Sequence, residues 1–219
     1  QETTINYEII IVDDGSADES VQIVKPYLGS MTRLIEIENS GIEVASNIGM
    51  RCANADLILR VDADDYLLPR YLDIMTSRLN KSGAAFLYCD YFVVDADNQV
   101  LYEEKLPSFQ SSEIIERGDF LATGTLYRKS LLERVGYYDA SVKNCGLENY
   151  DLILKLIAEG LIGQHIPLSL FAYRRHSLNI SNLRRNEIIH HGRQLFEKSS
   201  LGIYQTNSFH PYRLKIADE

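Results

Sequence analysis

The stretch Leu57-Ile-Leu-Arg-Val-Asp-Ala-Asp-Asp-Tyr66 carries the strongest structural signal in this chain. It begins as a run rich in aliphatic residues, and such a run bounded by polar residues is typical of a buried strand in a parallel sheet. Asp62, Asp64 and Asp65 follow at once, and Pro69 suits the first position of a helix expected over Pro69–Asn80. Open α/β sheets bind ligands at the carboxyl ends of their strands, so the acids lie where a ligand site is expected.

Asp62 and Asp64 are two residues apart, so both side chains point to one face of an extended segment. Two carboxylates on one face repel each other unless a positive charge lies between them, and Mg²⁺ and Mn²⁺ prefer oxygen ligands. An acid-rich turn can also serve only to cap a helix. The stretch therefore predicts a divalent-cation site, with a capping turn as the alternative.

The segments before and after this stretch predict an α/β fold. A capping box at Ser16 and Glu19 indicates that a helix begins there. The expected order is strand, helix, strand, helix, strand, with the bounds Tyr7–Val12, Ser16–Leu28, Arg33–Glu38, Asn39–Ala53 and Leu57–Val61. This order is typical of a doubly wound sheet with right-handed crossovers.

The second half of the chain mixes a hairpin with helices. We expect strands over Ala84–Val94, Val100–Glu104, Gly124–Tyr127 and Ile166–Tyr173, and helices over Ser112–Arg117, Ser130–Val135, Leu147–Glu159 and Leu183–Leu201.

Composition excludes several classes of protein. The 219 residues, 45% of them hydrophobic, suffice for one large domain, and no apolar run approaches the length that spans a membrane. The net charge of −9 argues against nucleic acid as a partner. Cys52, Cys89 and Cys145 are odd in number and far apart, which favours reduced thiols in the cytoplasm.

Six short motifs follow one another along the chain. They are Ile-Val-Asp-Asp-Gly-Ser (11–16), Asn-x-Gly with Ala-x-Asn-x-Gly (39–49), Asp-Ala-Asp-Asp (62–65), Gly-x-x-x-Arg-Lys (124–129), Gly-Leu-Glu-Asn-Tyr-Asp-Leu (146–152) and Tyr-Arg-Arg-His (173–176). In this order and spacing they resemble the family 2 glycosyltransferases of GT-A fold, over about residues 7–181.

The resemblance implies a Rossmann-like, doubly wound mixed sheet flanked by helices. It also implies an inverting transferase that uses a nucleotide-sugar donor, most often a UDP sugar, with Mn²⁺ or Mg²⁺, and a glycan or lipid-linked acceptor in polysaccharide biosynthesis. Chemistry agrees, because negative charge grows on the departing nucleoside diphosphate as the bond to the sugar breaks, and a cation stabilises that charge.

The resemblance also assigns roles on the donor side. Asp62 resembles the acid that contacts the ribose, Asp64 resembles the metal ligand, and His176 resembles a loop histidine that completes the metal shell, with Asp62 as a further candidate ligand. The other donor-binding candidates are Asp13 and Asp14 for the nucleoside, Asn39 and Asn47 for the base pocket, and Arg174 and Arg175 for phosphate. Helix capping for the acids and a generic basic loop for residues 174–176 are the alternatives. Asp65 is expected either to join the acids or to cap the following helix.

The acceptor side departs from the family pattern. Relatives carry Glu-Asp at the start of a helix, with the Asp as general base, whereas this chain has Glu148-Asn149. An amide cannot accept a proton at neutral pH, so the base is expected to be Glu148, with Asp151 one helical turn later as the alternative.

A second departure lies at the start of the chain. Relatives have a further strand between the strands expected at Tyr7–Val12 and Leu57–Val61, and residues 1–6 resemble only the end of the helix that follows it. We therefore expect this sequence to lack its first strand. The domain is expected over residues 1–182, with a nucleotide-binding half at about 1–105, an acceptor half at about 106–182, and a helical tail over 183–219.

Two other functions compete with this interpretation. A non-catalytic relative that binds nucleotide or glycan would explain Asn149. A phospho-acceptor signalling domain would share the Ile-Val-Asp-Asp motif, but the chain is too long for one. The expected location is the cytoplasm, with a peripheral contact between the basic helix Arg184–Lys198 and the membrane surface as one alternative and an ordinary solvated helix as the other.

Overall fold

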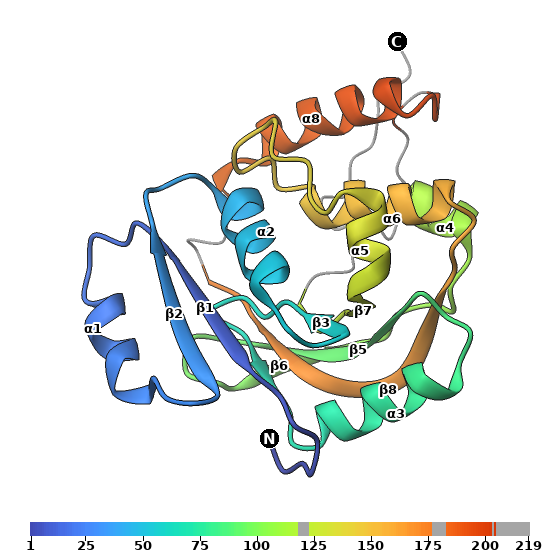
Figure 1. The fold of residues 1–219 in the computed structure, drawn as a ribbon. Coiled ribbons are helices and arrows are strands. Elements are labelled where there is room, and N and C mark those ends of the chain that lie inside the picture. Colours follow the sequence, from blue (N-terminus) through green and yellow to red (C-terminus); the bar gives the residue numbers. More distant parts are fainter. Residues whose placement is uncertain (118–122, 177–182, 203, 205–219) are drawn as a thin grey trace.

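The computed structural model describes residues 1–117, 123–176, 183–202 and 204, whose strands form two sheets (Figure 1). In the smaller sheet β1 (Ile9–Asp14) pairs in parallel with β2 (Thr32–Ile37). The six-stranded sheet has the order β3-β7-β5-β8-β4, and β6 pairs with β5. Its strands are β3 (Leu57–Leu59), β4 (Tyr66–Leu67), β5 (Phe86–Val94), β6 (Val100–Glu104), β7 (Leu126–Arg128) and β8 (Gly163–Arg174). Only the β5–β8 pair of this sheet is parallel, so the sheet is mixed.

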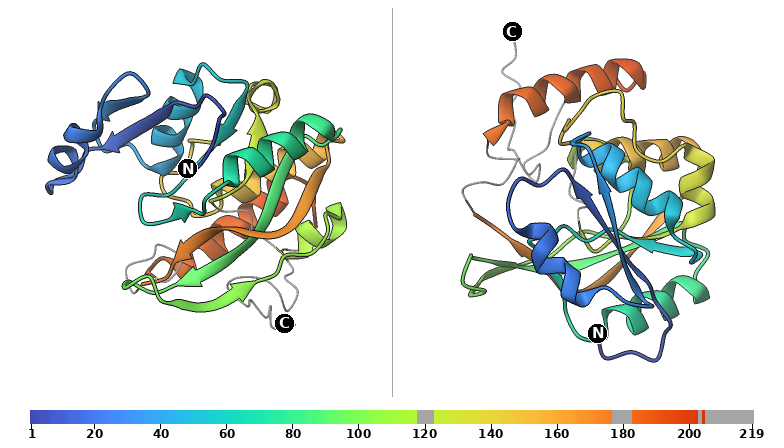
Figure 2. Two further views of the ribbon diagram at one scale, coloured as in Figure 1. Left: turned by 90° about the horizontal axis from the view of Figure 1, so that it is seen from below. Right: turned by 60° about the vertical axis from the view of Figure 1, so that its left-hand side comes forward.

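Helices cover both faces of the six-stranded sheet. The helices of the described residues are α1 (Ser20–Val24), the 3₁₀ turn η1 (Lys25–Tyr27), α2 (Ile42–Cys52), α3 (Tyr71–Lys81), α4 (Ser111–Arg117), α5 (Lys129–Val135), α6 (Glu148–Ala158) and α8 (Arg185–Lys198). Helix α3 lies on one face, α5 and α6 lie on the other, and α8 lies beyond α6 (Figure 1). The views in Figure 2 show that β1, β2 and α1 form a separate layer to one side.

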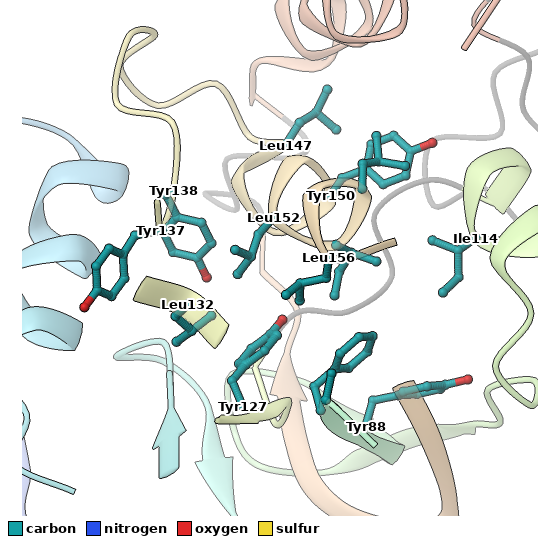
Figure 3. Packing of buried hydrophobic residues seen from close by; sticks show 14 of the residues in the cluster. Tyr88, Ile114, Tyr127, Leu132, Tyr137, Tyr138, Leu147, Tyr150, Leu152 and Leu156 are labelled. Carbon is teal, nitrogen blue, oxygen red and sulfur yellow. The ribbon is translucent and has the colours of Figure 1, made fainter. Parts of the chain in front are cut away.

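Strand β5 joins the two hydrophobic cores, because its side chains alternate between the faces of the sheet. Phe86 and Tyr88 pack into the cluster beneath α5 and α6, which Figure 3 shows, whereas Leu87 and Cys89 pack against α3. The end of β3 and the start of α6 therefore lie over a well-packed core.

The expected elements are confirmed in kind and order, and the α/β class with them. Two details of the central stretch were wrong. Strand β3 pairs antiparallel with β7 rather than lying within a parallel sheet, because β7 comes between it and β5. Helix α3 begins at Tyr71, two residues after Pro69, because Arg70 adopts a left-handed conformation with φ of 67°.

The expected capping box was also wrong. Helix α1 begins at Ser20 rather than near Ser16, and Asp18 accepts the Ser20 N–H. The N–H of Ser16 instead donates to Asp13, so these polar side chains close a turn before the helix. The chain continues as the 3₁₀ turn at Lys25–Tyr27, with Pro26 near its start, because proline does not fit the interior of an α-helix.

Within the described residues, β1 pairs with β2 alone and no strand connects it to β3. Among the same residues, no helix combines the length and the apolar character needed to cross a bilayer.

Candidate active site

Arg60, directly after β3, connects the two sides of the predicted site. Its Nε and Nη2 atoms lie 2.9 and 2.7 Å from Oδ1 of Asp62, and its Nη1 atom donates to Oε1 of Glu148 at 2.9 Å. Glu148 is the first residue of α6 and is separated from Arg60 by 88 positions in the sequence. The structure thus brings a predicted donor-side acid and the predicted base onto one guanidinium group.

The surroundings of Glu148 are buried. The residue is 6% exposed, and its Oε2 atom has no hydrogen-bond partner among the described residues. Beside it, the Tyr138 hydroxyl donates to Oδ1 of Asn149 at 2.6 Å, and the Tyr138 ring centre lies 5.7 Å from the Arg60 guanidinium carbon. Burial raises the pKa of Tyr138 to about 12, so its hydroxyl is a donor at neutral pH.

The charge of Arg60 is fixed by its partners. Burial acts to lower the pKa of Arg60, but the interactions with Tyr138, Asp62 and Glu148 outweigh it and raise that pKa well above its usual value. Arg60 is therefore a permanent cation between two carboxylates.

Asp64 and His176 meet although 112 positions separate them. Nε2 of His176 lies 2.9 Å from Oδ2 of Asp64, and their side chains are 30% and 38% exposed. A carboxylate and an imidazole are suitable ligands for Mn²⁺, and both are open to solvent, so this pair fits the predicted cation. Asp62, the further candidate, pairs with Arg60 instead.

Asp65 has a different role from the helix cap that was the alternative expectation. Its Oδ1 atom accepts the backbone N–H of Arg174 at 2.8 Å, which ties the acidic turn to the end of β8 rather than to α3. Burial, together with the nearby Asp62 and Asp64 charges, raises the pKa of Asp65 to about 6. The hydrogen bonds from Thr123 and Arg174 act in the opposite direction.

The two arginines before His176 contact their own chain. Arg174 donates from Nε to the Asp64 carbonyl at 2.8 Å and from Nη1 and Nη2 to the turn between β5 and β6. Nη1 of Arg175 lies 3.2 Å from the Tyr102 hydroxyl. Arg174 thus holds the hairpin turn against the acidic loop, and the phosphate-binding role of both arginines remains a prediction.

The carboxylate of Asp14 organises the loop before α2. Its two oxygens accept the backbone N–H groups of Ser40 and Gly41 at 2.6 and 2.9 Å, while Asp13 accepts the N–H of Ser16. Lys143 reaches the side chain and the carbonyl of Asn39. These contacts are structural, and roles of Asp13, Asp14 and Asn39 toward a nucleoside remain predictions.

Asn47, which was predicted to shape the base pocket, forms hydrogen bonds with the backbone of Tyr138. Its side-chain amide donates to the Tyr138 carbonyl at 2.9 Å, and its oxygen accepts the Tyr138 N–H at 3.0 Å. It therefore fixes the backbone of the tyrosine that lies beside Arg60.

Asp151, the alternative base, forms an ion pair with Lys155 at 2.6 Å. Asn149 accepts from Tyr138, as its amide chemistry allows. Glu148 is joined to the donor-side acid Asp62 directly through Arg60, whereas Asn149 is linked to Arg60 through the Tyr138 hydroxyl.

The sequence interpretation missed Arg60, Tyr138 and Glu43. Glu43 is fully buried in the first turn of α2, and its carboxylate accepts the N–H groups of Asn144 and Cys145, which fixes the loop that leads into α6. One carboxylate oxygen each of Glu43 and Glu148 and the Cys145 sulfur lie within 4.8 Å of one another. The one sequence signal for these residues was the charged side chain of Arg60 within an otherwise aliphatic run.

Comparison with known proteins identifies the kind of chain to which this arrangement belongs. The family model described as glycosyl transferase family 2 matches residues 1–136. The chain is 32% identical over 152 residues to the uncharacterized glycosyltransferase YwdF of Bacillus subtilis, covering 66% of this chain and 55% of YwdF. It is 27% identical over 206 residues to an Escherichia coli protein named UDP-Glc:alpha-D-GlcNAc-diphosphoundecaprenol beta-1,3-glucosyltransferase WfaP, covering 92% of this chain and 78% of WfaP.

A solved structure has the same fold. The crystal structure of Staphylococcus aureus TarS residues 1–349 in complex with UDP-GlcNAc aligns with a TM-score of 0.70 at 17% identity, over 90% of this chain and 58% of that one. The fold is therefore of GT-A type, as the motifs implied. The chain spans less than two thirds of the length of the first curated relatives that it matches.

Proposed function

This chain belongs to the family 2 glycosyltransferases, and from that premise we propose that it transfers a sugar from a UDP-sugar donor, with inversion, to a glycan or lipid-linked acceptor in polysaccharide biosynthesis. The relative WfaP is named for a UDP-Glc donor and a diphosphoundecaprenol acceptor, which supports both substrate classes, and the TarS complex with UDP-GlcNAc supports the donor. Three unpaired cysteines support a location in the reducing cytoplasm.

The observation that carries the proposal is the Arg60 junction, which places Glu148 beside the acidic turn after β3. A donor bound at that turn presents its reacting carbon next to α6. Asp64 and His176 would hold the divalent cation, which neutralises the diphosphate when bound.

Glu148 takes the part of general base in this proposal. The acceptor hydroxyl attacks the anomeric carbon on the face opposite the diphosphate, and its proton passes to the Glu148 carboxylate. A new bond between that carbon and the acceptor oxygen forms as the bond to phosphate breaks, and the electron pair leaves with the nucleoside diphosphate. Attack from the opposite face inverts the configuration.

The test is a transfer assay with a panel of UDP sugars, Mn²⁺ and oligosaccharide or lipid-diphosphate acceptors, in which released UDP and product mass are measured. Removing a general base costs about 10²–10⁴-fold, so we expect a loss of this size in Glu148→Gln. Glu133→Gln, which changes an exposed carboxylate on α5, is the matched control and keeps full activity. Unchanged transfer in Glu148→Gln contradicts the assignment of the base.

A second candidate function is binding of nucleotide or glycan without transfer, which Asn149 favours because it replaces the family's usual base. It predicts saturable UDP binding with no product from any donor in the panel. Product formation by the wild type excludes it.

A further inference from the structure

We propose that Arg60 is a positioning residue for the transfer reaction: it holds the Glu148 carboxylate in one orientation at the start of α6, and it couples this base to Asp62 on the donor side. The inference rests on the proposed function, and it concerns a side chain that none of the family motifs includes.

The geometry of the guanidinium group carries the first step. One edge, Nε with Nη2, faces Oδ1 of Asp62, and Nη1 at the other end faces Oε1 of Glu148. A planar group with donors on fixed sides can hold two carboxylates in set directions, whereas a lysine ammonium is a point charge that cannot. Oε1 of Glu148 is therefore held by Arg60, while the buried Oε2 atom accepts no hydrogen bond from the described residues.

Charge carries the second step. Glu148 is 6% exposed, and a buried carboxylate is tolerated only when it is paired. Arg60, whose side chain is 16% exposed, supplies that pairing. Without it, the buried Glu148 carboxylate would be unpaired, so it would turn away from its present position and would no longer be a positioned base.

Packing carries the third step. The ring of Tyr138 lies beside the guanidinium, its hydroxyl is tied to Asn149, and Asn47 holds its backbone through two hydrogen bonds. Arg60 is thus enclosed by fixed groups from α2 and α6. Side chains locked by their neighbours are what a precise catalytic geometry requires.

A purely structural ion pair is the competing explanation. In that case, replacing Arg60 would lower the melting temperature, and activity would fall only as far as the fraction of folded protein falls. A positioning role instead predicts that Arg60 matters to the rate only while Glu148 is present.

The experiment is a double-mutant cycle with Arg60→Gln, Glu148→Gln and the double variant, in which kcat, donor KM and melting temperature are measured. A misplaced catalytic group can cost about 100-fold, so we expect kcat to fall about 100-fold in Arg60→Gln while the donor KM changes by less than about 3-fold. In the Glu148→Gln background, the Arg60 change should cost no more than about 3-fold further, because residues that act as a unit are not additive.

Arg134→Gln is the matched control, because Arg134 on α5 is an arginine that forms an ion pair with a carboxylate, Glu159, away from the site. It should leave kcat unchanged. Arg60→Lys keeps the charge but loses the planar group. It takes the place of Arg60→Gln in the double-mutant cycle if that variant does not fold. Full activity in Arg60→Lys, or losses that multiply in the double variant, overturns the inference. An inactive wild type overturns the proposed function and this inference with it, whereas an active wild type with multiplying losses overturns this inference alone.

Discussion

The two sheets of the molecule differ sharply in burial. No residue of β1 or β2 is fully buried, whereas all but two residues of β5 are. Both hydrophobic clusters line the six-stranded sheet, and the small sheet contributes no side chain to the buried part of either. Asp13 and Asp14 thus lie on a lightly packed layer, and the Arg60 junction lies over a dense core.

The two layers of the candidate site differ in how tightly they are packed, and this difference fits the different roles that we propose for them. Proton transfer requires groups held within fractions of an ångström, and Glu148, the base that we propose, lies over the densely packed core. Hydrogen bonds from Ser40 and Gly41 to Asp14 join the small sheet to the loop before α2. A nucleoside pocket can be completed as the donor binds, so it tolerates a looser layer.

The largest effect should come from emptying the dense core. Phe86 on β5 is fully buried, and Phe86→Ala should destabilise the protein by about 3–5 kcal/mol. Ile9 on β1 is 44% exposed, so Ile9→Ala should cost about 0.5 kcal/mol or less. Urea unfolding followed by circular dichroism measures both. Equal losses would show that the two layers are packed alike.

A smaller effect should come from a buried polar group of the large sheet. Asp90 on β5 accepts hydrogen bonds from the Leu106 N–H and His165 and pairs with Lys105. Burial acts to raise the pKa of Asp90, but these partners outweigh it and hold the pKa below the ordinary 3.8. At pH 7, Asp90→Asn should cost about 1–3 kcal/mol.

The pH dependence of that variant has a definite sign. Because the folded-state pKa of Asp90 is lowered, its contribution to stability is present above about pH 4 and is lost as the pH falls through the folded-state value. The difference in free energy of unfolding between the wild type and Asp90→Asn should therefore become smaller below pH 4. Asp97→Asn, in the exposed turn after β5, is the control and should show no gap at any pH. A stability difference between the wild type and Asp90→Asn that stays constant down to pH 2 would contradict this role of Asp90.

Much of the fold could be predicted from the sequence, because hydrophobic periodicity and turn residues are local. The hairpin of β5 and β6 and helix α6 appear within a few residues of their expected bounds. Strand pairing is not local, so the sequence could not show that β7 lies beside β3 and makes that pairing antiparallel.

The same limit applies to the site. Asp64 and His176 were paired through the family resemblance, and their meeting supports it. The partners of Arg60 and Asn47 lie 88 and 91 positions away, and no spacing rule connects residues so far apart. Side chains that organise a site from a distance therefore stay hidden until the fold is known.

The smallest effect should come from restoring the family's usual acid. Asn149→Asp preserves the acceptor for the Tyr138 hydroxyl, and with Glu148 as base it should change kcat by less than about 3-fold, or ~0.6 kcal/mol. Steady-state transfer rates measure this, with Glu133→Gln as a surface control. A rise of 100-fold would show that position 149 is where the base belongs and that the natural chain is a weak catalyst.

The most direct test of the central claim is calorimetric titration of UDP with and without Mn²⁺, on the wild type and on Asp64→Ala. The account predicts that Mn²⁺ tightens UDP binding by at least about 10-fold in the wild type and by less than about 2-fold in Asp64→Ala, because the cation joins the diphosphate to this carboxylate. Asp97→Ala, which removes an exposed carboxylate of the hairpin turn, should behave as wild type. Equal UDP affinity with and without Mn²⁺ in the wild type, or a full Mn²⁺ effect in Asp64→Ala, would contradict it.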